Sequence, residues 1–401
     1  MLKGKTVVLG VCGSIAAYKT ANLASALKKL GADVHVIMTK NATNIINPIA
    51  FESLTGNKCM VETFDRNFQF NIAHIAIAEK ADICLIAPAS ANVIGKLANG
   101  IADDMLTTTV MAMKCKILVS PAMNVNMFNN PILQDNLGKL ERFGYTVIPP
   151  DNGYLACGAV GTGKMPSEDV LLEYILQEAE YEKDLKDLNI LVTAGPTREP
   201  IDPVRYITNH STGKMGYAIA KTAARRGAHV TLVTGPVELK RPLFADVVEI
   251  ETAGDMFEAV TERAADNDVI IKAAAVADYT PITVADNKIK KADGDLSLGL
   301  KRTNDILKWL GEHKKEGQII CGFSMETENV IENSRVKLTK KNADMIAANS
   351  LREENAGFGT DTNHIVLIEK DKITDIPMMS KEEAAGKLLD RIEELVKTRH
   401  S

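Results

Sequence analysis

The stretch KKLGADVHVIMT (Lys28–Thr39) decides the fold, and RRGAHVTLVTG (Arg225–Gly235) repeats its pattern. In both stretches a basic helix end meets a glycine, and an apolar run rich in β-branched residues follows. A glycine after a helix is a typical C-cap, and such an apolar run is typical of a buried strand. Each stretch is therefore predicted to lead from a first helix into a second strand, so that the chain contains two separate openings of a nucleotide-type α/β fold.

Strands and helices alternate around the first stretch. A helix is predicted over residues 15–30, where apolar residues recur with helical spacing. Short apolar runs predict strands at residues 6–11, 33–39, 82–87, 116–120 and 146–149. Apolar strands that alternate with helices indicate a parallel sheet covered on both faces.

The same alternation restarts in the second half of the chain. Helices are predicted over residues 213–226 and from Ser380, where Glu383 completes a capping box. Strands are predicted at residues 189–194, 229–234, 247–251, 268–274, 318–323, 344–348 and 364–369. The charged segment Gln177–Leu188 is interpreted as a helix end plus linker, so the predicted domains are residues 1–188 and 189–401. The predicted fold class is α/β, with two doubly wound parallel-sheet domains.

Composition excludes several classes of protein. The 401 residues are 45% hydrophobic and carry a net charge of −5, which disfavours a general nucleic-acid binder. No apolar run reaches the ~18 residues that span a bilayer. The first apolar run, Thr6–Val11, is too short for a signal peptide, and the six scattered cysteines form no CxxC motif. We therefore expect a cytoplasmic protein with reduced thiols, without membrane or nucleic-acid partners.

Small and polar residues follow the predicted strands of the first half. Gly10–Ser14 lies between the first strand and the first helix, where an anion can meet free N–H groups, although a tight turn explains the same residues equally well. Ser90 and Asn124 follow two further strands, and such strand ends border the ligand crevice of α/β sheets. His74 lies in an apolar run, where a core or surface histidine is more common than a catalytic one.

A glycine-rich stretch, Gly153–Met165, contains Cys157 and Lys164. Such a composition is typical of a flap or ligand loop rather than of a packed element. A cysteine on an exposed loop can act as an acid, whereas a buried cysteine is inert.

Five motifs in this order resemble the flavin-dependent cysteine decarboxylases: GVCGSIAAYK, NIAHI, PASANVIGKLANGIADD, PAMN and ACGAVGTGKM, all within residues 1–180. The resemblance implies a flavodoxin-like domain that binds FMN and removes carbon dioxide from 4′-phosphopantothenoyl-cysteine. It implies that His74 is the catalytic base, that Asn124 holds the substrate carboxylate and that Cys157 donates the final proton. Lys164 stands where an arginine is expected, so a bidentate fork becomes a point charge. The residues that the resemblance assigns to FMN are Gly13, Ser14, Ile15, Thr39 and Ser90.

Glycines, lysines and one aspartate stand out in the second half. ITNHSTGKMG (Ile207–Gly216) opens a helix but does not match GxxxxGK[ST], which excludes a P-loop. Asp278 either faces the crevice at the end of a predicted strand or caps a turn. The polar stretch Tyr279–Asp295 is predicted to be a mobile loop. Lys337 and Lys341 share one helix face, so they either face solvent or meet an anion such as a polyphosphate.

Two runs resemble the phosphopantothenate–cysteine ligases over residues 189–401: TAGPTREPIDPVRYITNHSTGKMG and KAAAVADYTP with NKIKK. The resemblance implies a Rossmann-like domain in which the carboxylate of 4′-phosphopantothenate attacks the α-phosphate of CTP, with Mg²⁺ present. The amine of cysteine then displaces CMP from the acyl-cytidylate. Asn209 is assigned to the acyl-cytidylate, and Lys288 is the loop lysine that closes on the phosphates. The residues assigned to CTP are Ala273, Ala274, Ala275, Asp278, Lys288, Asn304, Asp305, Ile306, Leu307, Phe323, Lys337 and Lys341.

The product of the second implied reaction is the substrate of the first, which favours consecutive steps of coenzyme A synthesis. A nicotinamide oxidoreductase is disfavoured because neither half has GxGxxG, and because Thr39 and Thr234 stand where an acidic residue should end the second strand. A non-catalytic regulatory relative should lack His74 or Cys157, and both are present. The resemblance also implies trimers through the first half and dimers through the second, which close most simply as a dodecamer.

Overall fold

The computed structural model describes residues 2–64, 73–156, 158–290, 296–326, 329–350, 357 and 359–399. The chain divides into two compact units, Met1–Tyr181 and Glu182–Ser401, and each is described by itself. The predicted boundary near residue 188 falls inside the second unit. Leu185 is fully buried in the core of that unit, and Asp184 pairs with Arg226 at 2.6 Å. The segment that the sequence suggested as a linker therefore ends with residues that pack on the second unit.

The first unit is built on a five-stranded parallel sheet in the order β2-β1-β3-β4-β5. Its strands are β1 (Thr6–Val11), β2 (Asp33–Met38), β3 (Ile83–Ala89), β4 (Lys116–Pro121) and β5 (Thr146–Val147). Each lies at a run that the sequence predicted. The order 2-1-3-4-5 is that of flavodoxin-like sheets, in which ligands bind beyond the carboxyl ends of the strands.

Alternate residues of β1 pack into two separate cores, which confirms a sheet covered on both faces. Val7, Leu9 and Val11 pack with helices α1 and α8, whereas Val8 packs with α4, α5 and α7. The helices of this unit are α1 (Lys19–Lys29), α2 (Pro48–Thr55), α3 (Ala73–Lys80), α4 (Ala91–Ala98), α5 (Met105–Ala112), α6 (Val125–Phe128), α7 (Pro131–Arg142) and α8 (Glu168–Ala179), with 3₁₀ turns η1 (Ile15–Tyr18) and η2 (Ala42–Asn44). The helix predicted from residue 15 is thus a 3₁₀ turn followed by α1, a common arrangement at helix starts.

The glycine-rich stretch forms a β-hairpin. Strand β6 (Asp151–Tyr154) pairs antiparallel with β7 (Val160–Lys164). The hairpin is attached to the loop after β4, because the Met123 N–H donates to the Gly163 carbonyl at 3.0 Å. The stretch predicted to be a flap or ligand loop therefore contains two paired strands, in which Gly153 lies opposite Gly161.

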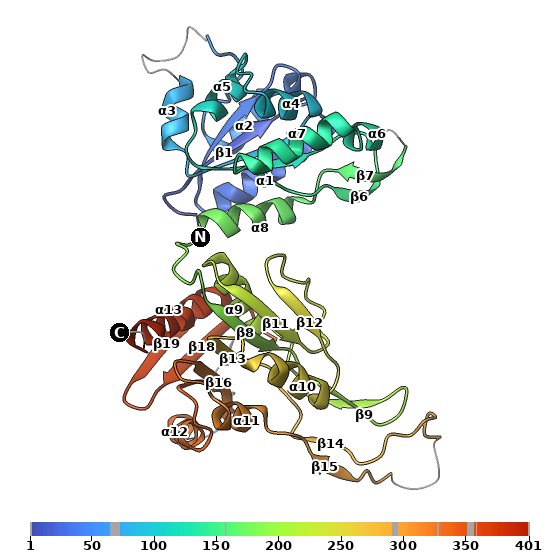
Figure 1. The fold of residues 1–401 in the computed structure, drawn as a ribbon, viewed down its shortest axis with the longest axis vertical. Coiled ribbons are helices and arrows are strands. Elements are labelled where there is room, and N and C mark those ends of the chain that lie inside the picture. The colour runs from blue at the N-terminus through green and yellow to red at the C-terminus, as the bar shows by residue number, and fades with distance from the viewer. Residues whose placement is uncertain are drawn as a thin grey trace. The chain divides into compact units, whose positions relative to one another are not determined.

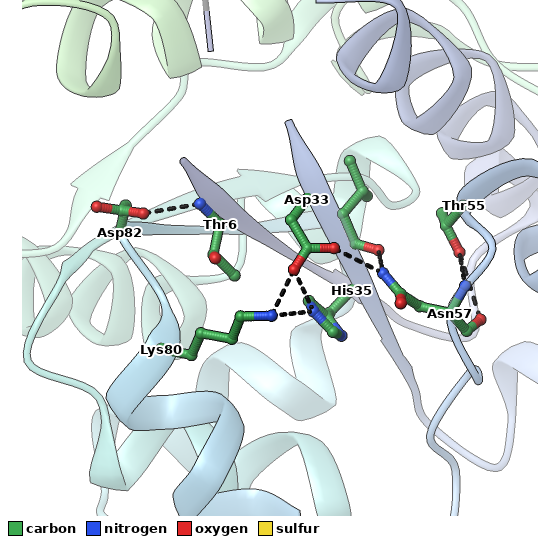
Figure 2. A network of polar contacts seen from close by, with 8 residues as sticks. Thr6, Asp33, His35, Thr55, Asn57, Lys80 and Asp82 are labelled. Carbon is green, nitrogen blue, oxygen red and sulfur yellow. Dashed lines mark hydrogen bonds and ion pairs between the residues drawn. The ribbon is translucent and has the colours of Figure 1, made fainter. Parts of the chain in front are cut away.

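A polar network ties α3 to the amino end of the sheet (Figure 2). Lys80, the last residue of α3, donates to Asp33 Oδ2 at the start of β2, and Asn57 Nδ2 donates to Asp33 Oδ1 at 2.9 Å. Burial would raise the pKa of Asp33, but Lys80, Asn57 and His35 outweigh burial and hold that pKa well below its usual range. This network fixes the end of the helix that carries His74.

The second unit contains an eight-stranded sheet in the order β12-β11-β8-β13-β16-β17-β18-β19. Its strands are β8 (Asn189–Ala194), β11 (His229–Thr234), β12 (Asp246–Glu249), β13 (Val269–Lys272), β16 (Ile319–Glu326), β17 (Met345–Ser350), β18 (Thr362–Ile368) and β19 (Ile373–Ser380). The first six are parallel and have the Rossmann order 3-2-1-4-5-6, whereas β18 and β19 are antiparallel. The switch point lies between β8 and β13.

Helices cover both faces of this sheet as well. Helices α9 (Lys214–Arg225) and α13 (Lys381–Arg399) pack on one face, and α10 (Ala253–Ala264), α11 (Ile306–Glu312) and α12 (Val330–Lys340) contribute to the core on the other. The predicted capping box is confirmed, since Ser380 N–H donates to Glu383 Oε2 at 3.1 Å and Glu383 N–H donates to Ser380 Oγ at 3.2 Å.

Two short antiparallel pairs extend from the sheet (Figure 1). They are β9 (Arg198–Pro200) with β10 (Tyr206–Thr208), and β14 (Tyr279–Pro281) with β15 (Leu300–Arg302). The stretch predicted to be a mobile loop from Tyr279 therefore begins with a paired strand. Residues 291–295 of that stretch lie outside the described residues.

Candidate functional site

The N-terminal cavity is a hollow of about 440 Å³ at the carboxyl ends of β1 and β4. Four residues predicted from the sequence line it: Ser14 and Ile15 after β1, Asn124 after β4, and Lys164 at the end of β7. The hairpin also contributes Tyr154 and Leu155. Asn124 caps α6, because its Oδ1 accepts from the Asn126 N–H at 2.8 Å.

The loop after β1, beside this cavity, packs closely against the loop after β2. A Cβ at Gly13 would lie 2.7 Å from Asn41 Cβ, so only glycine allows this close approach of the backbone. Among the described residues, Thr39 Oγ1 and Ser120 Oγ are buried without a hydrogen-bond partner. Ser120 lies near the end of β4, at the same carboxyl edge of the sheet as Thr39. Orphaned hydroxyl groups at the carboxyl edge of a sheet fit a cofactor that supplies polar partners.

The structure does not bring every predicted residue to this cavity. Ser90 caps α4 through a hydrogen bond from the Val93 N–H at 3.4 Å, and neither Ser90 nor His74 lines the N-terminal cavity. His74 is half-buried near the start of α3. Cys157 lies outside the described residues.

The lysine cavity, of about 390 Å³, gathers most of the residues assigned to the nucleotide. Segments from several elements meet there: the end of β13 and the loop after it, the paired strands β14 and β15, the start of α11, β16 and the end of α12. The predicted residues that line it are Asp278, Asn304, Asp305, Ile306, Leu307, Phe323, Lys337 and Lys341. Lys337 and Lys341, which the sequence left between solvent and an anion, thus face a common cavity.

The charges in the lysine cavity are held by specific contacts. Lys341 Nζ pairs with Asp305 Oδ2, and Asp305 Oδ1 accepts from the Lys308 N–H at 2.9 Å as the N-cap of α11. Burial would raise the pKa of Asp305, but these two contacts lower it overall, so the carboxylate stays ionised. Lys337 Nζ donates to the Phe323 carbonyl at 3.3 Å.

Lys272 is one of two cations of this site that the sequence did not assign, and Arg302 is the other. Lys272 ends β13 and lines the lysine cavity with Lys337 and Lys341. Burial and then the nearby Lys337 lower the pKa of Lys272 to about 8, against the opposing effects of Asp305 and Asp278. The available signal was a lysine that interrupts an otherwise apolar strand, VIIK, one residue before the run assigned to CTP.

The asparagine cavity, of about 230 Å³, adjoins the lysine cavity at the switch point of the sheet. The two share Lys272, Val276, Asp278, Phe323 and Lys337. Ala273, Ala274 and Ala275 line the asparagine cavity, together with residues 211–216 at the start of α9 and Asn349, Asn363 and Lys381 from the far side.

Side-chain hydrogen bonds set the loops at the switch point. Thr193 Oγ1 accepts from the Ala274 N–H, and Thr197 Oγ1 accepts from the Ala277 N–H, both at 3.1 Å. Asn209 Nδ2 donates to the Ala275 carbonyl at 3.0 Å. The structure thus brings Asn209 to the loop that the resemblance assigned to CTP.

Lys288 is not brought to either cavity of the second unit. It is exposed, and the neighbouring Ile289 is attached to the turn at residues 202–205. Ile289 N–H donates to Asp202 Oδ2 at 3.0 Å, and Arg205 donates to the Ile289 carbonyl at 2.8 Å. Arg205 and three backbone N–H groups hold the pKa of Asp202 well below its usual range.

Two features are absent from the described residues. No helix among them is both long and apolar enough to cross a membrane. No group of three or more His, Cys, Asp or Glu side chains in the same part of the chain could hold a metal ion.

Known proteins and protein-family models match this chain over nearly its whole length. The model of the family Flavoprotein matches residues 1–180, and that of the DNA/pantothenate metabolism flavoprotein C-terminal domain matches residues 185–396. The coenzyme A biosynthesis bifunctional protein CoaBC of Bacillus subtilis (strain 168) is 46% identical over 99% of this chain and 98% of its own. CoaBC of Vibrio vulnificus (strain YJ016) is 40% identical over 98% of this chain and 99% of its own.

Solved structures match the two parts separately. The crystal structure of the C-terminal domain of a coenzyme A biosynthesis bifunctional protein CoaBC is 44% identical, with a TM-score of 0.47, and covers 54% of this chain and 100% of its own. The full-length identity to the curated relatives and the two family matches agree in order and extent. The chain therefore belongs to the family of bifunctional coenzyme A biosynthesis proteins CoaBC.

Proposed function

We propose that this protein joins 4′-phosphopantothenate to cysteine in its second unit and decarboxylates the product to 4′-phosphopantetheine in its first. The observation that carries the proposal is the lysine cavity. Residues separated by more than sixty positions in sequence, from Asp278 to Lys341, converge there on one hollow with three lysines. A cluster of cations in a concave site at strand ends fits a nucleoside triphosphate.

The ligation needs an activated carboxyl group, because a carboxylate is a poor electrophile for an amine. A carboxylate oxygen of 4′-phosphopantothenate forms a bond to the α-phosphorus of CTP, the bond to the β-phosphate breaks, and pyrophosphate leaves. Lys272, Lys337 and Lys341 offset the phosphate charge in this step. The amine of cysteine then forms a bond to the acyl carbon, CMP leaves with the electron pair, and the amine loses its proton.

Mg²⁺ is proposed to accompany the triphosphate, and the phosphate oxygens themselves are ligands of the kind that this ion prefers. Asn209, bonded to the Ala275 carbonyl, is proposed to lie at the acyl-cytidylate. Lys288, on its exposed loop, is proposed to reach the phosphates only when the nucleotide is bound.

The decarboxylation is proposed to use FMN beside the N-terminal cavity, at Gly13, Ser14, Ile15, Thr39 and the Ser90 region. When bound, the cofactor would supply reversible hydride transfer with the thiol-bearing carbon of the substrate, whose oxidation creates the electron sink for loss of carbon dioxide. The orphaned Thr39 hydroxyl fits a cofactor that supplies a polar partner. Asn124, in the cavity wall, holds the substrate carboxylate. His74 accepts a proton and Cys157 returns one, and Lys164 adds a positive charge at the same cavity.

Both sites are proposed to depend on assembly. His74 does not line the N-terminal cavity of its own chain, so we propose that it serves a cavity on a neighbouring subunit. Large apolar side chains are exposed on this unit, including Ile132 at 73% and Phe143 at 68%. Trimers of the first unit and dimers of the second, closed as a dodecamer in the cytoplasm, are the proposed state.

Two measurements on the purified protein test the two activities separately. A flavin absorbance band, with FMN released on denaturation, supports the decarboxylase, and a colourless protein that binds a nicotinamide nucleotide would contradict it. Release of pyrophosphate from CTP that requires 4′-phosphopantothenate but not cysteine supports the ligase. Pyrophosphate release that requires cysteine, or none at all, would contradict the acyl-cytidylate.

A further inference from the structure

Two buried amide oxygens in the asparagine cavity lack a partner. Asn349 on β17 and Asn363 on β18 are 7% and 1% exposed, and both line the cavity. Among the described residues, no group donates to Asn349 Oδ1 or to Asn363 Oδ1. The amide nitrogen of Asn363 donates to Met215 Sδ at 3.8 Å. The amide oxygen of Asn363 is therefore not the atom that contacts Met215. A buried acceptor without a donor costs free energy, so this pair indicates a ligand that donates hydrogen bonds.

The same cavity carries an excess of positive charge. Lys272, Lys337 and Lys381 line it, against the single lining carboxylate of Asp278. A fourth lysine of the wall, Lys214, pairs with Asp361 at 2.7 Å. Lys381 is 6% exposed, and its Nζ donates to the carbonyls of Gly357 at 2.8 Å and of Thr360. An ammonium group has three donors, so one remains for an anionic group of a ligand.

The unpartnered asparagine oxygens and the positive charge of the cavity together indicate the class of ligand that fits it. A phosphate or carboxylate alone would pair with the lysines, but when ionised it has no hydrogen to donate to the asparagine oxygens. A simple amine would satisfy the oxygens and be repelled by the lysines. A zwitterion, with an ammonium group and a carboxylate on one carbon, satisfies both sets.

The position of the asparagine cavity and its apolar wall further restrict which zwitterion fits there. The cavity adjoins the lysine cavity through Phe323 and shared lysines, and Ala273–Ala275 line it. An amine held there lies next to the site proposed for the acyl-cytidylate. Met215, Phe323 and Met325 line the cavity with thioether and aromatic surface, which suits a thiol side chain.

We propose that the asparagine cavity binds the free cysteine substrate, with Asn349 and Asn363 accepting hydrogen bonds from its ammonium group and with Lys381 and Lys272 facing its carboxylate. The inference rests on the proposed ligase function and names the residues that hold its amino-acid substrate. Asn349, Asn363 and Lys381 then serve cysteine alone, whereas Lys272 also faces the nucleotide. The half-reaction without cysteine therefore tests the two asparagines separately from nucleotide binding.

The test uses the full-length variants Asn349→Ala and Asn363→Ala. The KM for cysteine is expected to rise about tenfold or more in each variant, and saturating cysteine should restore turnover. Pyrophosphate release without cysteine, from CTP and 4′-phosphopantothenate, should stay at the wild-type rate. Asn267→Ala is the matched control, because Asn267 bonds the Arg263 carbonyl at the end of α10, away from both cavities. It should leave every constant unchanged.

Several outcomes would overturn the proposal. An unchanged KM for cysteine in both variants would do so, as would a rise confined to CTP or to 4′-phosphopantothenate. Thermal unfolding identifies a variant that fails to fold, and the other asparagine then provides the test. If the wild-type protein releases no pyrophosphate, the ligase proposal fails. Calorimetric titration of cysteine into wild-type and Asn363→Ala protein still tests whether the asparagine cavity binds cysteine, with binding expected only in the wild type.

Discussion

At the residue scale, the lysine cavity depends on cations that the fold holds in fixed places. Lys341 pairs with Asp305, Lys337 bonds the Phe323 carbonyl, and Lys272 ends a buried strand between them. Sequence spacing could place Lys337 and Lys341 on one helix face, but it could not tell whether that face met solvent. Lys272 was missed because its role depends on β16 and α12 packing beside β13, which no local pattern encodes.

The helix α12 offers a matched pair of lysines for a binding test. Lys341 lines the cavity, whereas its neighbour Lys340 is exposed and does not. Charge-assisted hydrogen bonds contribute about 1.5–3 kcal/mol, so Lys341→Met is expected to raise the Kd for CTP roughly tenfold to hundredfold. Lys340→Met should leave the Kd unchanged in the same titration calorimetry. Equal effects of the two substitutions would show that only general surface charge attracts the nucleotide.

The pKa of Lys272 predicts a pH dependence. Burial and Lys337 lower this pKa to about 8, so the ligand-free protein loses the charge of Lys272 as pH rises above that value. The phosphate of CTP favours the charged form, and affinity is therefore expected to be constant below about pH 8 and to fall above it. The charged groups facing Lys272 are Asp278, Asp305, Lys337 and Lys341.

Kd values for CTP between pH 7 and pH 9.5 check this expectation. Lys272→Met should bind CTP more weakly at pH 7 and show a flatter profile above pH 8. A profile of the variant that is parallel to the wild type would assign the titration to another group.

At the element scale, the β6–β7 hairpin forms part of the N-terminal cavity and is fixed by a close backbone approach. Gly163 has φ +140°, and a Cβ there would lie 2.4 Å from the Met123 carbonyl oxygen. Gly163→Ala is therefore expected to displace the hairpin and to raise the KM of the decarboxylase about tenfold or more, while CTP-dependent pyrophosphate release is unchanged.

The control for the hairpin is Gly138→Ala in α7. No atom lies within 4 Å of a Cβ built at Gly138, so this substitution should leave both activities intact and change stability by less than about 1 kcal/mol. Steady-state kinetics of the two half-reactions compare the variants. Normal decarboxylation by Gly163→Ala would mean that the hairpin position does not matter.

The strands of both sheets were predictable because apolar runs bounded by glycine have few alternatives. Strand β8, for example, has the predicted bounds, Asn189–Ala194. The strands of the hairpin were not predicted because glycine and polar residues form much of them. The pair β14–β15 was not predicted because it joins two three-residue segments about twenty positions apart. The final edge strand β19 was missed as well, because Ile376 is the one buried residue of its eight and the strand has little apolar periodicity.

At the scale of the whole molecule, the boundary between the units decides which fragments fold. Leu185 is buried in the second core, and Asp184 binds Arg226. A fragment of residues 189–401 loses both contacts, so its Tm is expected to lie roughly 5–15 °C below that of residues 182–401. Differential scanning calorimetry of the two fragments measures this difference. Equal Tm values would show that residues 182–188 do not stabilise the second unit, and would support a boundary at residue 188.

The proposed assembly makes a separate prediction of mass. Light scattering is expected to give about twelve chains for the full protein, three for residues 1–181 and two for residues 182–401. A full-length monomer with both activities would contradict the assembly, and with it the placing of His74 at a neighbouring subunit's cavity.

The most direct test of the whole account is one incubation of the full chain with 4′-phosphopantothenate, cysteine, CTP and Mg²⁺, followed by mass analysis of the products. The account predicts 4′-phosphopantetheine and carbon dioxide, with CMP and pyrophosphate formed in equal amounts to the product. Recovery of unchanged 4′-phosphopantothenate, or of 4′-phosphopantothenoyl-cysteine that is never decarboxylated by the FMN-loaded protein, would contradict it.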